Sequence, residues 1–161
     1  MAEDIYIPSN ATKTEIFEAL LPQIFSFTQY ETSRAASLGN VTAIIKEAFN
    51  LFWVGFYLVE QDKLVLNAFQ GPVACTRIFY GKGVCGTSWQ REQTIVVEDV
   101  DKFEGHIACS SSSKSEIVIP LKKRGKVLGV LDIDSDTLAT FDSIDKKYYE
   151  KICDIIVENC F

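Results

Sequence analysis

Three of the five cysteines are candidates for chemistry, and Cys109 among them lies where no apolar period surrounds it, so its thiol is expected to be exposed. Cys75 and Cys85 flank a short predicted strand and a glycine-rich turn, and Cys109 lies in a long loop after His106 and before a run of serines. A thiolate is a nucleophile that oxidises to a sulfenic acid, which a second thiol resolves as a disulfide. These residues predict thiol redox chemistry. Loop exposure favours Cys109 over Cys85 as the attacking thiol, and Cys75 and Cys85 remain alternative resolving thiols.

The other candidate ligands and nucleophiles have simpler interpretations. His106 could lower the pKa of a nearby thiol or act only as a hydrogen-bonded neighbour. Cys153 follows the apolar period of the last predicted helix, and Cys160 lies near the chain end, so both are assigned to packing. With one histidine and no C-x-x-C pair, the sequence predicts no structural zinc site.

Three acidic residues could meet on one face of a predicted hairpin. Asp132 and Asp134 fall at i and i+2 on one strand, so they share a face and repel each other. A three-residue loop at 124–126 would place Glu116 opposite Asp134, whereas a two-residue loop would turn Glu116 to the other face. Together the acids would suit an ammonium group, a metal ion or a shared proton, because crowding raises carboxyl pKa values. The alternative is that the two aspartates are solvated acids at a strand end.

Aromatic residues mark the first predicted strand. Trp53 and Tyr57 are four residues apart and share a face, and we expect Phe52 and Phe56 to point the other way. The first pair is either core or an apolar wall for a methyl or thioether group. The glycine-rich stretch 81–86 does not match a phosphate-binding loop, so no nucleotide site is predicted.

The apolar periods predict the elements that position these residues. Helices are expected over 13–28, with a kink or a break at Pro22, over 33–49, in a short segment ending at Arg91, and over 143–159. Strands are expected over 52–59, 64–69, 74–79, 94–97, 115–121 and 127–135. Because hairpins join most strands, we expect an α+β fold with a mostly antiparallel sheet. The segment 99–114 is long enough to act as a lid or binding loop.

Composition limits the classes of partner. The length of 161 residues and the 47% hydrophobic content favour a single domain over 1–161. A formal charge of −6 argues against nucleic acid and anionic lipid as partners. The longest apolar run, 51–59, is too short to span a bilayer, and the acidic start is unlike a secretory signal. We therefore expect a cytoplasmic protein whose cysteines are thiols.

Several of these motifs coincide with one known family. They are WVGFYL at 53–58, GVCG at 83–86, GHIAC at 105–109, SEIV at 115–118 with Pro120, and GVLDIDS at 129–135. Together with the spacing of the three loop cysteines, they resemble the free methionine-R-sulfoxide reductases, enzymes built on a GAF domain. The likeness covers nearly the whole chain. One departure is Ser110, because family members usually carry an acid directly after the loop cysteine.

The resemblance implies a GAF-like fold and stereospecific reduction of free methionine (R)-sulfoxide, with thioredoxin as reductant and with no cofactor or metal. In the implied reaction, a cysteine thiolate attacks the sulfoxide sulfur and a protonated acid donates to the sulfoxide oxygen. The implied catalytic residues are Cys109, Cys85 and Cys75, and the implied substrate-binding residues are Glu116, Asp132, Asp134, Trp53 and Tyr57. A homodimer is compatible with the likeness. The competing hypothesis is a non-catalytic GAF module that binds a small ligand, although such a module needs no three loop thiols.

Overall fold

Six strands form one antiparallel sheet, in the order β3-β2-β1-β6-β5-β4, in the computed structural model, which describes residues 4–107 and 109–161. The strands are β1 (Trp53–Glu60), β2 (Lys63–Gln70), β3 (Arg77–Phe79), β4 (Ile95–Val97), β5 (Ser115–Lys123) and β6 (Lys126–Ser135). The helices are α1 (Lys13–Thr28), α2 (Arg34–Phe49), α3 (Gly83–Arg91) and α4 (Ser143–Cys160), with a 3₁₀ turn at Val100–Lys102. The predicted α+β fold is confirmed.

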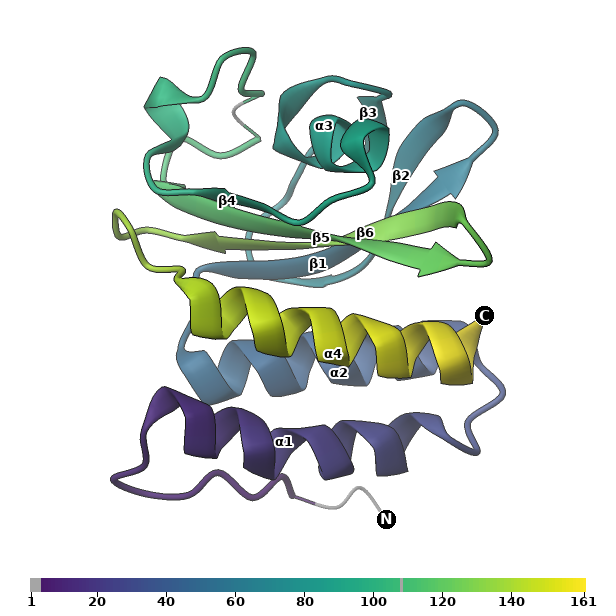
Figure 1. Ribbon diagram of the computed structural model, residues 1–161, viewed down its shortest axis with the longest axis vertical. Helices are drawn as coiled ribbons and strands as arrows, with labels where there is room; N and C mark the ends of the chain where they lie inside the picture. Colours follow the sequence, from purple (N-terminus) through teal and green to yellow (C-terminus); the bar gives the residue numbers. More distant parts are fainter. Residues whose placement is uncertain (1–3, 108) are drawn as a thin grey trace.

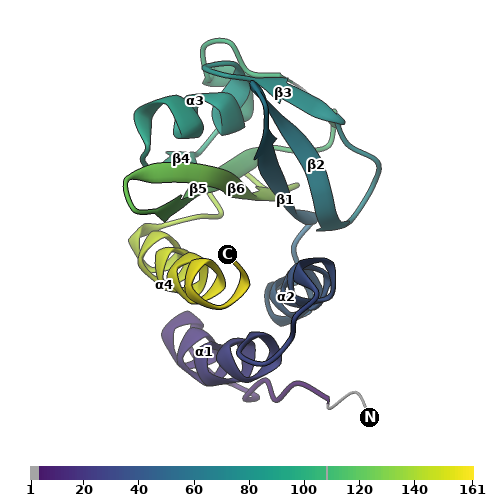
Figure 2. The same ribbon diagram turned by 90° about the vertical axis from the view of Figure 1, so that its right-hand side faces the viewer.

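The elements are stacked in layers. Helices α2 and α4 pack side by side on one face of the sheet, and α1 packs beneath them as an outer layer (Figures 1 and 2). Helix α3 and the loop that follows β4 cover the opposite face. In the part of the chain that the structure describes, no helix combines the length and apolar character needed to cross a membrane.

Helix α1 is continuous through Pro22, so the break that the sequence left open does not occur. Proline removes one backbone hydrogen bond and crowds the preceding turn. Tertiary packing outweighs this effect, because Phe17, Leu20 and Ile24 are fully buried on one side of the helix. Thr12 begins the helix with a capping box that satisfies its first free N–H groups.

The sheet separates two apolar clusters. On the side of α1, α2 and α4, Phe56 joins the larger cluster. On the other side, Trp53 and Tyr57 pack with Val84 of α3. This alternation along β1 follows the expected period of two. Phe52 departs from the prediction and packs against the second cluster, because it precedes the strand and escapes the alternation.

The hairpin between β5 and β6 turns on two residues rather than three. Arg124 and Gly125 form the loop, and both have a positive φ, as the favoured two-residue hairpin turn requires. The sequence-based expectation was that such a loop would turn Glu116 away from the aspartates of β6. That expectation is wrong.

A β-bulge restores the register. Lys122 pairs with Val127, whereas Leu121 pairs with Gly129, so β6 carries one extra residue, Leu128. An extra residue on one strand shifts all later pairs by one and reverses the face of that strand relative to its partner. The bulge therefore returns the acid of β5 to the face that carries the two acids of β6.

Candidate active site

A pocket lies on the sheet face that α3 covers, between the loop before β3 and the loop before β5. Its lining includes seven of the eight residues singled out from the sequence, namely Trp53, Tyr57, Cys85, Cys109, Glu116, Asp132 and Asp134. The eighth, Cys75, is bonded to one of the seven. Elements distant in sequence thus bring thiols, acids and aromatic rings to one pocket.

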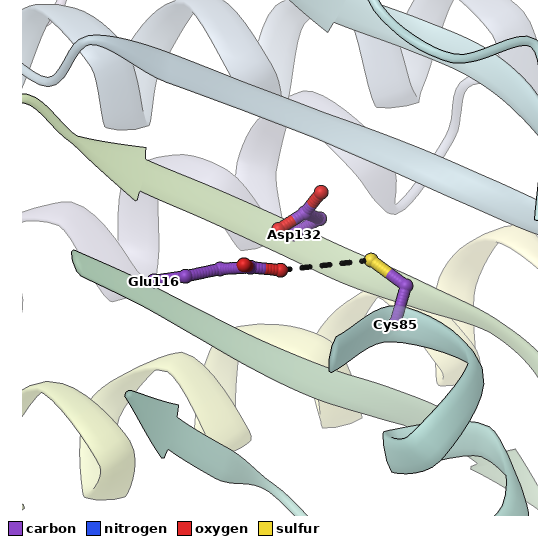
Figure 3. Close-up of side chains that lie close together, drawn as sticks. All are labelled: Cys85, Glu116 and Asp132. Atoms are coloured by element: carbon purple, nitrogen blue, oxygen red, sulfur yellow. Dashed lines mark hydrogen bonds between the residues drawn. The ribbon is translucent and has the colours of Figure 1, made fainter. Parts of the chain in front are cut away.

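Cys75 and Cys109 form a disulfide, with Cα atoms 5.3 Å apart. Both residues are partly exposed and lie in loops; Cys109 lines the pocket, and Cys75 directly follows the lining residues 72–74. Cys85 remains a free thiol and is buried in the first turn of α3. The sequence left Cys75 and Cys85 open as partners of Cys109. In the structure Cys75 is the disulfide partner of Cys109, because the Cys85 side chain points from α3 towards the sheet (Figure 3).

The acids form the floor of the pocket. Glu116 pairs with Asp134 across the β5–β6 ladder, and Asp132 lies one pleat further on the same face. Glu116 is 6% exposed and Asp132 is 7% exposed. The Cys85 Sγ atom lies 4.0 Å from Glu116 Oε1, and one ligand atom from each of Cys85, Glu116 and Asp132 lies within 4.8 Å of the others (Figure 3).

Burial and crowding favour the protonated forms of the acids on this floor. Burial, followed by the charge of neighbouring acids, raises the pKa of Glu116 and of Asp132 well above their usual range. Burial raises the pKa of Asp134 to about 6, although a hydrogen bond from Ser113 acts in the opposite direction. Burial also raises the pKa of the Cys85 thiol. The site can therefore supply a proton to a bound group.

Two neighbours of the acids were not assigned from the sequence. His106 Nε2 lies 3.8 Å from Glu116 Oε2, and burial lowers the pKa of this imidazole. Ser113, which is buried, hydrogen-bonds Asp134 and so ties the cysteine loop to β6. The run of serines at 110–113 was visible in the sequence, but nothing local indicated which hydroxyl group reaches an acid.

The aromatic wall also anchors the loop that carries Cys75. The Trp53 ring stacks on Tyr57 and on Phe69, with centroids 6.1 and 5.5 Å apart. Trp53 Nε1 donates a 3.0 Å hydrogen bond to the carbonyl oxygen of Pro72, and the Tyr57 hydroxyl donates one of 3.0 Å to that of Cys75. Strand β1 thus fixes both the apolar wall and the disulfide loop.

The comparisons with known proteins agree with this fold and this site. The GAF domain family matches residues 33–157, which places the chain among GAF domain proteins. GAF domain-containing protein A of Dictyostelium discoideum is 59% identical over 157 residues, covering 97% of this chain and 99% of its own length. The free methionine-R-sulfoxide reductase of Saccharomyces cerevisiae is 39% identical over 168 residues, covering 99% and 93%.

A solved structure gives the same result. The free methionine-R-sulfoxide reductase of Neisseria meningitidis, solved in complex with its substrate, has a TM-score of 0.94 to this chain. It is 48% identical in sequence, and the match covers 97% of this chain and 94% of that one. The chain belongs to the GAF domain family and, within it, to the free methionine-R-sulfoxide reductases.

Proposed function

We propose that this chain reduces free methionine (R)-sulfoxide to methionine in the pocket described above. One observation carries the proposal: Cys109, half of a disulfide between two loop cysteines, lines a pocket whose floor is buried acids with raised pKa values. Opening that disulfide yields two thiols beside a proton donor, which are the groups that sulfoxide reduction requires. Relatives named free methionine-R-sulfoxide reductase support the substrate class.

Each part of the substrate finds a complementary surface. The methyl and thioether end packs on the rings of Trp53 and Tyr57, which are 4% and 1% exposed. The polar groups of the amino acid and the sulfoxide oxygen face the acids of β5 and β6. A zwitterion has no net charge, so the formal charge of −6 on the chain does not oppose binding.

The first chemical step uses Cys109. Its thiolate attacks the sulfoxide sulfur while a protonated acid on the pocket floor donates a proton to the sulfoxide oxygen. The S–O bond of the substrate breaks, and the oxygen is transferred to the Cys109 sulfur. The substrate sulfur is reduced by two electrons to the thioether of methionine, and Cys109 is oxidised to a sulfenic acid.

The second step closes the disulfide. The Cys75 thiol attacks the Cys109 sulfur, and the sulfenic oxygen leaves as water with the thiol proton. Thioredoxin, a dithiol protein, then returns the two cysteines to thiols by disulfide exchange. Both cysteines are partly exposed, so an external dithiol can reach them. Cys85 forms no disulfide in this cycle, since its buried side chain points to the acids.

Chiral product analysis tests the proposal. Racemic free methionine sulfoxide, and a peptide containing the oxidised residue, are incubated with the protein, thioredoxin, thioredoxin reductase and NADPH. We expect loss of the free R epimer only. Cys109→Ser should abolish turnover, and Cys75→Ser should stop after one turnover with a sulfenic acid on Cys109. Cys160→Ser, at the far end of α4, is the matched control and should keep wild-type activity.

Two results would overturn this function. One is consumption of both epimers or of the peptide substrate, and the other is full activity in Cys109→Ser. A non-catalytic GAF module would instead bind the sulfoxide without turnover, and the same assay separates that case. Glu116→Gln, Asp132→Asn and Asp134→Asn should each impair turnover while circular dichroism reports an intact fold.

A further inference from the structure

The floor of the pocket combines one thiol with two carboxyl groups whose ligand atoms face one another. The Cys85 Sγ atom and a carboxyl oxygen from each of Glu116 and Asp132 lie within 4.8 Å of one another, and all three residues are buried (Figure 3). They come from α3, β5 and β6, so the sheet and one helix hold the set in place.

A second observation points to a ligand at this place. Among the described residues, Asp132 Oδ1 has no hydrogen-bond partner, although Asp132 is only 7% exposed. An unpaired buried carboxyl oxygen is costly unless a bound group supplies positive charge or a hydrogen. Asp132 lines the pocket, as do Cys85 and Glu116, so a small cation entering the pocket can reach all three.

The donor set selects the kind of cation. One sulfur with two carboxylate oxygens suits Zn²⁺, whereas Mg²⁺ and Ca²⁺ prefer six or more oxygen ligands. Zinc bonds of about 2.0–2.3 Å place tetrahedral ligand atoms about 3.5 Å apart. The Cys85 Sγ to Glu116 Oε1 distance of 4.0 Å therefore needs only a small contraction. These three residues are the set whose ligand atoms lie together, so a solvent oxygen completes four-coordination.

We propose that Cys85, Glu116 and Asp132, with a solvent oxygen as the fourth ligand, form a Zn²⁺ site that competes with the sulfoxide substrate. The competition rests on the proposed function, whereas metal binding does not. The three ligands line the same pocket that is proposed to hold the sulfoxide, so the metal and the substrate occupy the same space. Zinc is thus an inhibitor of the proposed reaction.

Cobalt titration tests the site directly. The protein with the Cys75–Cys109 disulfide closed is freed of metal with EDTA, dialysed and titrated with Co²⁺. In this form the free thiols are Cys85, Cys153 and Cys160. We expect a thiolate-to-cobalt charge-transfer band together with tetrahedral visible bands, and Zn²⁺ should bleach both. A wild-type protein that gives no such band would overturn the metal site.

Substitutions identify which side chains bind the cobalt ion. Cys85→Ser should abolish it, whereas Cys153→Ala and Cys160→Ser should retain it, because both of these cysteines lie on α4 across the sheet. If Cys85→Ser does not fold, Asp132→Asn keeps the thiol and should raise the Co²⁺ dissociation constant roughly tenfold or more. The control is Asp136→Asn, an exposed acid just after β6, which should leave the constant unchanged. Equal Co²⁺ affinity in wild type and Asp132→Asn would overturn the assignment.

Competition between the sulfoxide and Co²⁺ is measured from the same charge-transfer band, so it requires no catalytic turnover. Methionine (R)-sulfoxide should raise the apparent dissociation constant for Co²⁺, and the S epimer should not. A band that neither epimer weakens would overturn the competition and leave the metal site standing. Absence of sulfoxide turnover in the chiral assay, with the cobalt band present, would instead count against the proposed function alone.

Discussion

The hydroxyl group of Tyr57 donates a 3.0 Å hydrogen bond to the backbone carbonyl oxygen of Cys75. Tyr57 belongs to β1 and is 1% exposed, whereas Cys75 lies in a loop between β2 and β3. Burial, followed by the nearby acids, raises the pKa of Tyr57, so its hydroxyl remains a donor. A central strand of the sheet thus holds in place the loop that carries one half of the disulfide.

Tyr57→Phe should slow disulfide closure while preserving the aromatic wall. Loss of one buried hydrogen bond costs about 1 kcal/mol, which corresponds to roughly a fivefold change in rate if it acts fully on the resolving step. The Cys109 sulfenic acid should then persist longer, as measured by dimedone trapping and mass spectrometry after a single turnover. Tyr30→Phe, at a side chain that is 87% exposed, is the control. Closure at the wild-type rate in Tyr57→Phe would contradict the positioning role.

Asp132→Asn should stabilise the fold at neutral pH while impairing turnover. Because burial raises the pKa of Asp132 in the folded chain, the folded state holds more protons than the unfolded state. The free energy of unfolding therefore falls as pH rises above the unfolded pKa of about 4. The amide removes this penalty, and we expect a gain on the order of 1 kcal/mol at pH 7.

Thermal unfolding of the disulfide form measures this gain. It should be present at pH 7 and shrink towards pH 4, where both the folded and the unfolded carboxyl groups become protonated. Asp136→Asn, at an exposed position, should show no such pH-dependent gain. A lower melting temperature for Asp132→Asn at pH 7 would show that the carboxyl group stabilises the fold, against this expectation.

Asp134→Asn should move the pH profile of the reaction. The charge of Asp134 raises the pKa of Glu116 and of Asp132. Removing that charge lowers both pKa values, so the limb of kcat that depends on a protonated acid should shift to lower pH. Single-turnover rates across pH, with Asp136→Asn as control, measure the shift. If the pH of this limb were unchanged or higher in Asp134→Asn, transfer of a carboxyl proton would not be part of the rate-determining step.

Gly55→Ala should displace the aromatic wall that Trp53 and Tyr57 form. A Cβ at residue 55 would collide with the Trp53 ring and lie 2.7 Å from the Cβ of Phe69. We expect the indole to be displaced, with KM for the sulfoxide raised roughly tenfold and the free energy of unfolding lowered by about 1–3 kcal/mol.

Gly39→Ala is the control, because nothing lies within 4 Å of its added Cβ in α2. It should be neutral or stabilising by about 0.5–1 kcal/mol. A wild-type KM in Gly55→Ala would contradict the role of Trp53 in binding.

The elements of this protein follow from local patterns in its sequence. The apolar period of 3.6 predicted α1 with the bounds observed and α2 to within a residue, and alternation predicted that Trp53 and Tyr57 share a face. The same period of two put Asp132 and Asp134 together on β6. These features depend only on the repeat of an element and on the side chains within it, so the sequence alone determined them.

The tertiary structure decided how those elements meet. The face of Glu116 depended on the bulge at Leu128, and the partner of Cys109 depended on where two loops cross the pocket. The approach of His106 to Glu116 likewise joins a loop to a strand. Each of these contacts is set by the register of distant strands and by the packing of α3 on the sheet, and a local pattern carries no information about either.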